Sequence, residues 1–218
     1  MIELLVKAGL SYLLGSVIGS LAVARLTGGA DIRTLGSGNA GASNALRTQG
    51  RKVALAVLLI DLSKGWIATA VIASWLMPAA LIAPASATLA PWRAPVCGIA
   101  VMLGHIYPLW YGLRGGKGVA TLLGAVLGIN AWLLPPMILT WLVAVIAFGY
   151  VGLASILAAM ALAVAIAFTS PAAPLVCFGA LSALLILFTH RSNIARMRAG
   201  TESRARRLWL FGTRRGPA

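Results

Sequence analysis

The stretch VATLLGAVLGINAWLLPPMILTWLVAVIAFGYVGLASILAAMALAVAIAFTS, residues 119 to 170, contains no Asp, Glu, Lys or Arg. A soluble domain rarely carries so long an apolar run, whereas each helix that crosses a bilayer needs about 20 apolar residues. The whole chain agrees with this stretch, because 60% of its 218 residues are hydrophobic and 10% are charged. The composition therefore predicts an all-α integral membrane protein.

Seven apolar runs extend along the chain on both sides of and within this stretch. They cover residues 4–26, 53–77, 94–111, 119–134, 136–149, 151–170 and 174–189. We therefore expect about seven transmembrane helices in one domain, residues 1–218. The boundaries near Pro135 and Gly149 rest only on helix-breaking residues, so five or six spans stay open. Several short or broken helices are expected around a polar cavity, since a membrane tolerates irregular backbone only there.

The basic residues predict the orientation of the bundle. With the N-terminus outside the cell, 15 Lys and Arg residues fall on the cytoplasmic face and only Arg93 falls in the opposite loops. Because short cytoplasmic loops carry an excess of Lys and Arg, we expect an outside N-terminus and a cytoplasmic C-terminus. Anionic lipid headgroups and this bias account for the net charge of +14. No recognition helix or zinc pattern accompanies the charge, so nucleic acid is not expected as a partner.

Three glycine-rich polar segments interrupt the apolar chain and, in this orientation, share the cytoplasmic face. The first is GSGNAGASNALR, residues 36 to 47. Glycines let backbone amides approach a phosphate, and an arginine can pair with two phosphate oxygens at once. A flexible loop whose Ser or Asn caps the next helix is the alternative. The candidate phosphate-binding residues of this segment are Gly36, Ser37, Gly38, Asn39, Ser43, Asn44 and Arg47.

The second segment is GLRGGKGVAT, residues 112 to 121, which opens an apolar run. Amides at a helix N-terminus favour an anion, and a lysine adds a full charge. Gly115, Gly116, Lys117 and Gly118 are therefore candidate phosphate-binding residues. The alternative is an interfacial turn whose lysine extends to the membrane surface. The glycine and lysine spacing is not that of a Walker P-loop.

The third segment, THRSNIARMRAGTE, ends the last apolar run at residues 189 to 202. On a continuing helix, His190 and Asn193 lie three positions apart and can face the same cavity. The histidine can serve as a general base or as a hydrogen-bonding group. A structural role for a lone interfacial histidine is the alternative.

Asp61 and Lys64 lie three positions apart inside the second apolar run. Each charge costs roughly 2.5 to 3.5 kcal/mol near the bilayer centre, so the two should pair and face protein. A structural ion pair is the favoured interpretation, and a place at the floor of the polar cavity is the alternative.

The acidic residues limit the chemistry that the chain can perform. They number four, at Glu3, Asp31, Asp61 and Glu202, and their scatter offers no local carboxylate pair for Mg²⁺. Neither histidine begins an HxxxxD motif, and no Gly-x-Ser-x-Gly elbow occurs. These patterns favour a reaction on a substrate that is already activated, with no metal and no cofactor.

Taken together, the segments resemble one family, the bacterial acyl-phosphate:glycerol-3-phosphate acyltransferases (PlsY). The resemblance covers most of the chain in a constant order. It is carried by YLLGS (12–16), DIRTLGSGNAGASNALRTQG (31–50), LLIDLSKG (58–65), LGHIYP (103–108), RGGKGVAT (114–121) and HRSNIARMRAGTE (190–202). One departure lies at Tyr150 to Ser155, where two hydroxyls usual in the family are missing and Ser155 is kept.

The resemblance implies a reaction and a set of site residues. The expected enzyme transfers a fatty acyl group from acyl phosphate to the 1-hydroxyl of sn-glycerol 3-phosphate in the bacterial cytoplasmic membrane, giving lysophosphatidic acid and phosphate. Its partners would be these two substrates, the bilayer and the enzyme that makes acyl phosphate. The implied catalytic residues are Ser37, Arg47, Lys117, His190 and Asn193. The implied binding residues are Gly36, Gly38, Asn39, Ser43, Asn44, Gly115, Gly116, Gly118, Ser155 and Arg191.

A transporter or flippase for a phosphorylated metabolite or lipid is the competing interpretation. Intramembrane charges and broken helices also mark translocation routes. The polar segments gather on one face without a matching set on the other, and no internal repeat relates two halves of the sequence. Both observations favour the enzyme.

Overall fold

The computed structural model describes residues 1–76 and 86–205, where all regular structure is helical. The longer helices are α1 (Ile2–Gly15), α2 (Gly19–Thr27), α3 (Ala42–Thr48), α4 (Arg51–Trp66), α6 (Arg93–Ile106), α7 (Val119–Ile129), α8 (Leu134–Phe148), α9 (Val151–Thr169), α10 (Ala173–Thr189) and α11 (Arg191–Arg198). The shorter elements are η1 (Ile32–Thr34), η2 (Ile67–Ile72, a π-helix that extends α4), α5 (Ser86–Leu89), η4 (Ala90–Trp92), η5 (Leu109–Tyr111) and η6 (Ala131–Leu133).

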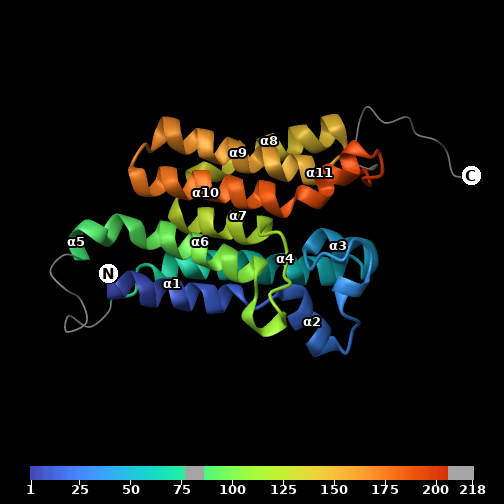
Figure 1. The fold of residues 1–218 in the computed structure, drawn as a ribbon, viewed down its shortest axis with the longest axis horizontal. Coiled ribbons are helices and arrows are strands. Elements are labelled where there is room, and N and C mark those ends of the chain that lie inside the picture. Colours follow the sequence, from blue (N-terminus) through green and yellow to red (C-terminus); the bar gives the residue numbers. More distant parts are fainter. Residues whose placement is uncertain (77–85, 206–218) are drawn as a thin grey trace, which may run out of the picture.

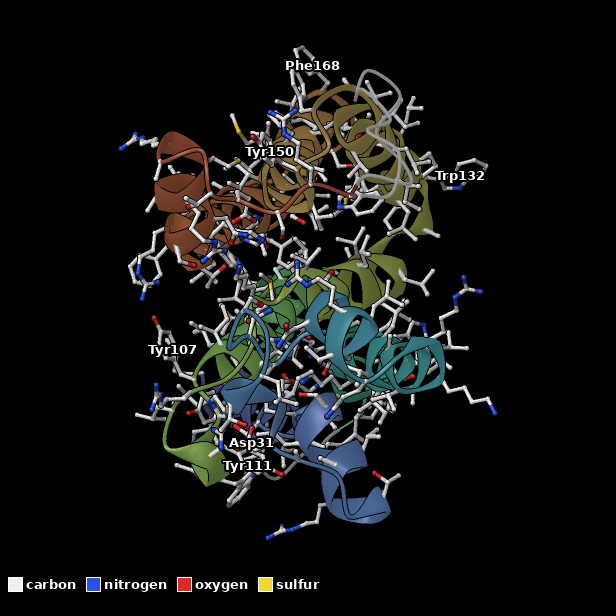
Figure 2. All side chains as sticks on the ribbon, turned by 90° about the vertical axis from the view of Figure 1, so that its right-hand side faces the viewer. Asp31, Tyr107, Tyr111, Trp132, Tyr150 and Phe168 are labelled. Atoms are coloured by element: carbon white, nitrogen blue, oxygen red, sulfur yellow. The ribbon has the colours of Figure 1, made fainter. Side chains whose placement is uncertain are left out.

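The helices lie side by side along the long axis of the molecule (Figure 1). One group contains α1, α4 and α6, another contains α8, α9 and α10, and α7 lies between the two groups. A buried cluster around Met102, Leu122, Leu162 and Phe178 joins α6, α7, α9 and α10. Trp132 and Phe168 point away from the bundle (Figure 2), with 86% of each side chain exposed. Such surfaces suit contact with lipid.

The predicted all-helical membrane fold is confirmed, and the candidate spans in the described residues reach six, a number that the sequence left open beside seven. Within the described residues, four continuous helices are long and apolar enough to cross a membrane, and two bent pairs raise the number to six. The pairs are α1 with α2, bent by 47°, and α10 with α11, bent by 51°. The remaining apolar run forms α7, whose 11 residues extend only about 16 Å. That length is too short to cross a core of about 30 Å.

Helix α7 packs closely against α4 because glycines lie at their crossing. A Cβ on Gly124 would collide with the backbone oxygen of Leu62, and a Cβ on Gly65 would collide with that of Thr121. Small residues at crossings let membrane helices approach until their backbones touch. The short helix is therefore held by packing against protein.

The Asp61 and Lys64 ion pair is confirmed, and it fixes the bend between α1 and α2. The Lys64 ammonium lies 3.0 Å from Asp61 Oδ1 and donates to the carbonyl oxygens of Gly15 and Val17, at 3.0 and 2.7 Å. Asp61 Oδ1 accepts the amide hydrogen of Gly19 at 3.2 Å. Helix ends leave carbonyls and amides unpaired, and these two charges satisfy both ends at the break.

The loops that carry the three polar segments meet at one end of the bundle. We call it the site end; it is the end with α2, α3 and α11, at the right of Figure 1. The N-terminus and α5 lie at the opposite end.

Candidate active site

Asn44 builds the first loop at the site end. Its side chain is fully buried, and its amide nitrogen donates to the carbonyl oxygens of Ile32, Leu35 and Asn39 at 2.9 to 3.2 Å. Its Oδ1 accepts the amide hydrogen of Ser37 at 3.0 Å. Asn44 therefore acts as the scaffold of the loop, and its predicted role in binding phosphate stays a prediction.

The loop presents Ser37 and Arg47 on its exposed side. Arg47 donates to Ser37 Oγ at 3.1 Å and, through its other terminal nitrogen, to Ser203 Oγ at 3.1 Å. Within the described residues, the hydrogen-bond partners of this guanidinium are therefore neutral hydroxyls. Its charge remains available to an anion.

The other predicted residues of the first loop shape it or lie beside it. Gly36 and Gly38 have φ angles of +56° and +70°, the left-handed conformation that glycine adopts without strain. Ser43 is exposed in the first turn of α3. Asn39 lines a cavity at the site end.

The glycine loop of the second segment folds back onto the end of α6. The amides of Gly115 and Gly116 donate to the carbonyl oxygens of Ile106 and His105, each at 3.1 Å. Those two amides are occupied, so the first amides of α7, from Gly118 onward, are the ones left to face an anion. The predicted role of Gly115 and Gly116 in binding phosphate stays a prediction, and their amides are not free to donate to it in this arrangement. These residues are glycines because a Cβ on either would collide with His105.

Lys117 joins the second segment to the third. Its ammonium donates to Asn193 Oδ1, and its carbonyl accepts a hydrogen bond of 3.1 Å from Thr189 Oγ1. Burial, together with the charges of Arg196 and Arg47 and against the opposing effect of Glu202, lowers the pKa of Lys117 to about 8. Cations thus gather here more densely than the nearby acid can balance.

Glu202 orders the third segment and was not among the predicted site residues. Its two carboxylate oxygens accept from Asn193 Nδ2 at 2.6 Å and from Arg196 Nε at 2.5 Å. Asn193 is thereby held with its oxygen toward Lys117. The signal for Glu202 was its rarity, as one of four acids in the chain and the only one in the third segment.

His190 begins the bend between α10 and α11, and its side chain is buried. Its Nδ1 lies 2.8 Å from the carbonyl oxygen of Ile186. A carbonyl can only accept, so Nδ1 carries the hydrogen and Nε2 of the neutral ring keeps a free lone pair. That nitrogen has the form that a general base requires.

Arg33 fastens the first loop to the second and was not predicted. It pairs with Asp31 at 2.7 Å and donates to the carbonyl oxygens of Tyr111 and Arg114, at 3.1 and 3.2 Å. The Arg33 guanidinium lowers the pKa of Asp31. Figure 2, which faces the site end, shows Asp31 and Tyr111 next to each other.

Ser155 forms no hydrogen bond with these residues, and its predicted role in substrate binding stays a prediction. It donates to the carbonyl oxygen of Val151 at 2.9 Å and accepts from Trp141 Nε1 at 3.4 Å, between α8 and α9. The residue of that stretch that reaches the site is Gly152, because a Cβ there would lie 2.9 Å from the Asn193 side chain.

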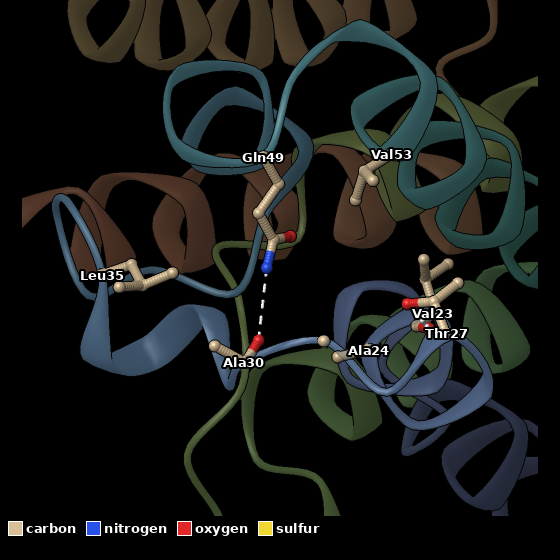
Figure 3. Close-up of a pocket in the computed structure, with 8 residues that line it drawn as sticks. Val23, Ala24, Thr27, Ala30, Leu35, Gln49 and Val53 are labelled. Carbon is tan, nitrogen blue, oxygen red and sulfur yellow. Dashed lines mark hydrogen bonds between the residues drawn. The ribbon is translucent and has the colours of Figure 1, made fainter.

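A cavity of about 250 Å³ opens where the loops meet. Arg191, which was predicted, is exposed and lines it. The lining residues are Asn39, Ile106, Tyr107, Leu113, Arg114, Gly115, Gly116, Lys117, Thr189 and Arg191. A second hollow, of about 290 Å³, lies beside Leu35 and Gln49 and is mostly apolar (Figure 3). It is lined by none of the predicted site residues.

Hydrogen bonds therefore join Ser37 to Arg47 and Lys117 to Asn193, and Arg47 also binds Ser203, which follows the Glu202 that binds Asn193. His190 lies next to Thr189, whose hydroxyl binds the Lys117 carbonyl. Within the described residues, no group of three or more His, Cys, Asp or Glu side chains could hold a metal ion. The arrangement can bind anionic groups through cations, hydroxyls and helix amides, and can accept a proton.

Comparisons with known proteins agree with this geometry. Residues 5–200 match the family model described as "Glycerol-3-phosphate acyltransferase". A glycerol-3-phosphate acyltransferase of Bordetella pertussis is 42% identical over 89% of this chain and 88% of its own length. One of Geobacter sulfurreducens is 38% identical over 94% and 98%. The crystal structure of the integral membrane glycerol 3-phosphate acyltransferase PlsY, in its glycerol 3-phosphate form, superposes with a TM-score of 0.80 at 32% identity, covering 92% of this chain and 94% of that one. A lysophosphatidic acid form gives 0.78.

Proposed function

The chain belongs to the glycerol-3-phosphate acyltransferase family, and we propose from that premise that it transfers a fatty acyl group from acyl phosphate to the 1-hydroxyl of sn-glycerol 3-phosphate. The products are lysophosphatidic acid and inorganic phosphate. Residues 1–218 act as one catalytic unit, without a cofactor. Family membership also decides against the transporter.

One observation carries the assignment of the site. Arg47 lies in α3 and Lys117 in the glycine loop, yet Lys117 contacts Asn193 of the third segment and Arg47 contacts Ser203, the residue that follows that segment. The hydrogen-bond partners of both cations, Ser37 included, are neutral within the described residues. Two phosphorylated substrates repel each other, so an enzyme that joins them must hold positive charge between or around them. Arg47 and Lys117 supply that charge at the convergence of the loops.

The reaction needs little activation beyond this arrangement. Acyl phosphate is a mixed anhydride whose phosphate already leaves readily. The 1-hydroxyl oxygen attacks the acyl carbonyl carbon, an ester bond forms, the bond from that carbon to the phosphate oxygen breaks, and the phosphate leaves with the bond electrons. Arg47, Lys117 and the first amides of α7 stabilise the negative charge that develops. The hydroxyl proton passes to His190 Nε2 or to a substrate phosphate oxygen.

We also propose that the site end faces the cytoplasm of a bacterial cell, with the enzyme in the cytoplasmic membrane. The exposed cations Arg25, Arg51 and Lys52 at this end support the orientation. The acyl phosphate then comes from an enzyme on the same side, and the acyl chain of the product stays in the bilayer.

The test measures lysophosphatidic acid made by purified protein in detergent. With palmitoyl phosphate and glycerol 3-phosphate, we expect product even with excess chelator, and essentially none with palmitoyl-CoA as donor. A catalytically silenced control, Arg47→Ala, should lose at least about 100-fold in rate, the effect of removing one charge-stabilising donor. Comparable rates from the CoA thioester would overturn the donor assignment, and abolition by the chelator would overturn the metal-free mechanism.

A further inference from the structure

His105 lies at the end of α6, beneath the glycine loop, and the mechanism above does not use it. Its side chain is 3% exposed. Its Nδ1 lies 2.8 Å from the Lys64 ammonium and 3.5 Å from Asp61 Oδ1. One ring nitrogen is thus connected to the buried ion pair that fixes the bend between α1 and α2.

The other ring nitrogen faces the loop. An ammonium can only donate, so Nδ1 accepts from Lys64 and the hydrogen of the neutral ring is on Nε2. A Cβ added to Gly116 would meet this Nε2 before any other atom. The loop therefore lies directly on the imidazole, and the two hydrogen bonds from Gly115 and Gly116 to the end of α6 hold it there.

The ring has little freedom to move away. Lys64 is also bound by Asp61 and by the carbonyl oxygens of Gly15 and Val17. Turning the imidazole would break its bond to Lys64 and leave buried polar atoms without partners, which is unfavourable. The surface under Gly116 is consequently rigid.

We infer that His105 is a positioning residue for the transfer reaction: its imidazole sets where the glycine loop places Lys117 and the first turn of α7. The chain of contacts runs from Lys64 to His105, from His105 to Gly116, and from Lys117, the next residue, to Asn193. The inference rests on the proposed function, because it takes the loop to bind a substrate phosphate.

The first test separates positioning from simple filling of space. His105→Ala should raise the KM for one phosphorylated substrate about tenfold or more, because a misplaced loop weakens binding, while kcat changes less than about threefold. The substrate whose KM rises is the one whose phosphate the loop binds. Val101→Ala removes buried volume from the same helix one turn earlier, and should lower the melting temperature without changing either KM.

Two conservative variants show which ring nitrogen matters. The amide group of His105→Gln can reach the place of Nε2 under the loop, whereas that of His105→Asn can reach only the place of Nδ1 beside Lys64. We expect Gln to recover part of the loss in KM and Asn to recover none. Recovery by Asn and not by Gln would overturn the inference, because the ring would then matter only as a partner of Lys64.

The last test is a double-mutant cycle between the ring and the loop. Gly116→Ala places a methyl against the imidazole, so it should weaken binding at least about threefold more when His105 is present than when it is Ala. Additive effects, or unchanged KM values in His105→Ala, would refute the positioning role. Wild-type turnover of acyl phosphate is measured first: its absence would defeat the proposed function, whereas its presence with unchanged variant kinetics would defeat this inference alone.

Discussion

At the scale of single residues, the same residue type can bind substrate or build the loop that binds it. Asn39 and Asn44 lie five positions apart in one glycine-rich segment. The side-chain oxygen and nitrogen of Asn44 are both hydrogen-bonded to the loop backbone, whereas Asn39 lines the cavity. The two should respond differently to substitution.

Asn44→Ala should unfold more easily than the wild type by at least about 2 kcal/mol, because buried carbonyls and the Ser37 amide lose their partner. Asn44→Asp should be no better, since its second carboxylate oxygen would face three carbonyl oxygens. Asn39→Ala, the control, should lose activity at a nearly unchanged melting temperature. The measurements are thermal unfolding in detergent and the initial rates of the same proteins. An Asn44→Ala protein of normal stability would contradict the scaffold role.

The pKa of Lys117, about 8, gives activity and stability opposite responses to pH. Below pH 8 the lysine is charged and binds phosphate; above it the free enzyme loses the charge, so kcat/KM should fall. Folding responds in reverse: the unfolded lysine keeps its proton to about pH 10.5, so stability should rise as pH increases from 8. Lys117→Arg stays charged and should lose the alkaline fall in kcat/KM. A fall retained in that variant would assign it to another group.

The sequence predicted which residues meet better than it predicted what each one does. Four predicted site residues form two hydrogen-bonded pairs, Ser37 with Arg47 and Lys117 with Asn193. Their roles toward substrate stay predictions. Glu202 and the direction of the Gly115 amide depend on how distant segments fold over one another, which spacing along the chain does not encode.

At the scale of helices, the apolar pattern located the long helices, and the glycines explain why α7 can be so short. Sequence boundaries near residue 149 were correct because Gly149 ends α8 in the left-handed conformation. The apolar run at 119–134 is longer than the helix it forms, because α7 ends at Ile129 and Asn130 then turns the chain. The length of the run therefore overstated the length of the helix. Packing, rather than hydrophobic length, holds this helix.

The crossing of α4 and α7 should be intolerant of a single methyl. Gly124→Ala forces the two backbones apart and should cost about 1 to 3 kcal/mol, the range for overpacked cores. Gly9→Ala is the matched control, because nothing lies within 4 Å of its added Cβ. It should be neutral or slightly stabilising, by up to about 1 kcal/mol. Equal melting temperatures for the two variants would contradict the close crossing.

At the scale of the whole molecule, the proposed active site lies at one end of the bundle. The insertion of the bundle into the membrane determines which side of the membrane this end faces. In a protein with Cys97 and Cys177 replaced, Thr34→Cys lies at the site end and Ala172→Cys, between α9 and α10, lies at the opposite end. An impermeant thiol reagent should label residue 172 in intact cells and residue 34 only after permeabilisation. The reverse pattern would invert the proposed orientation.

The fastening of the three segments also governs when activity can begin. Arg47 is made early in the chain, but its partner Ser203 and the Asn193 that meets Lys117 are made near its end. A nascent chain that ends before these residues therefore holds only part of the proposed charge site. We expect catalysis to begin only after residues 193 to 203 have left the ribosome and packed against the first two segments.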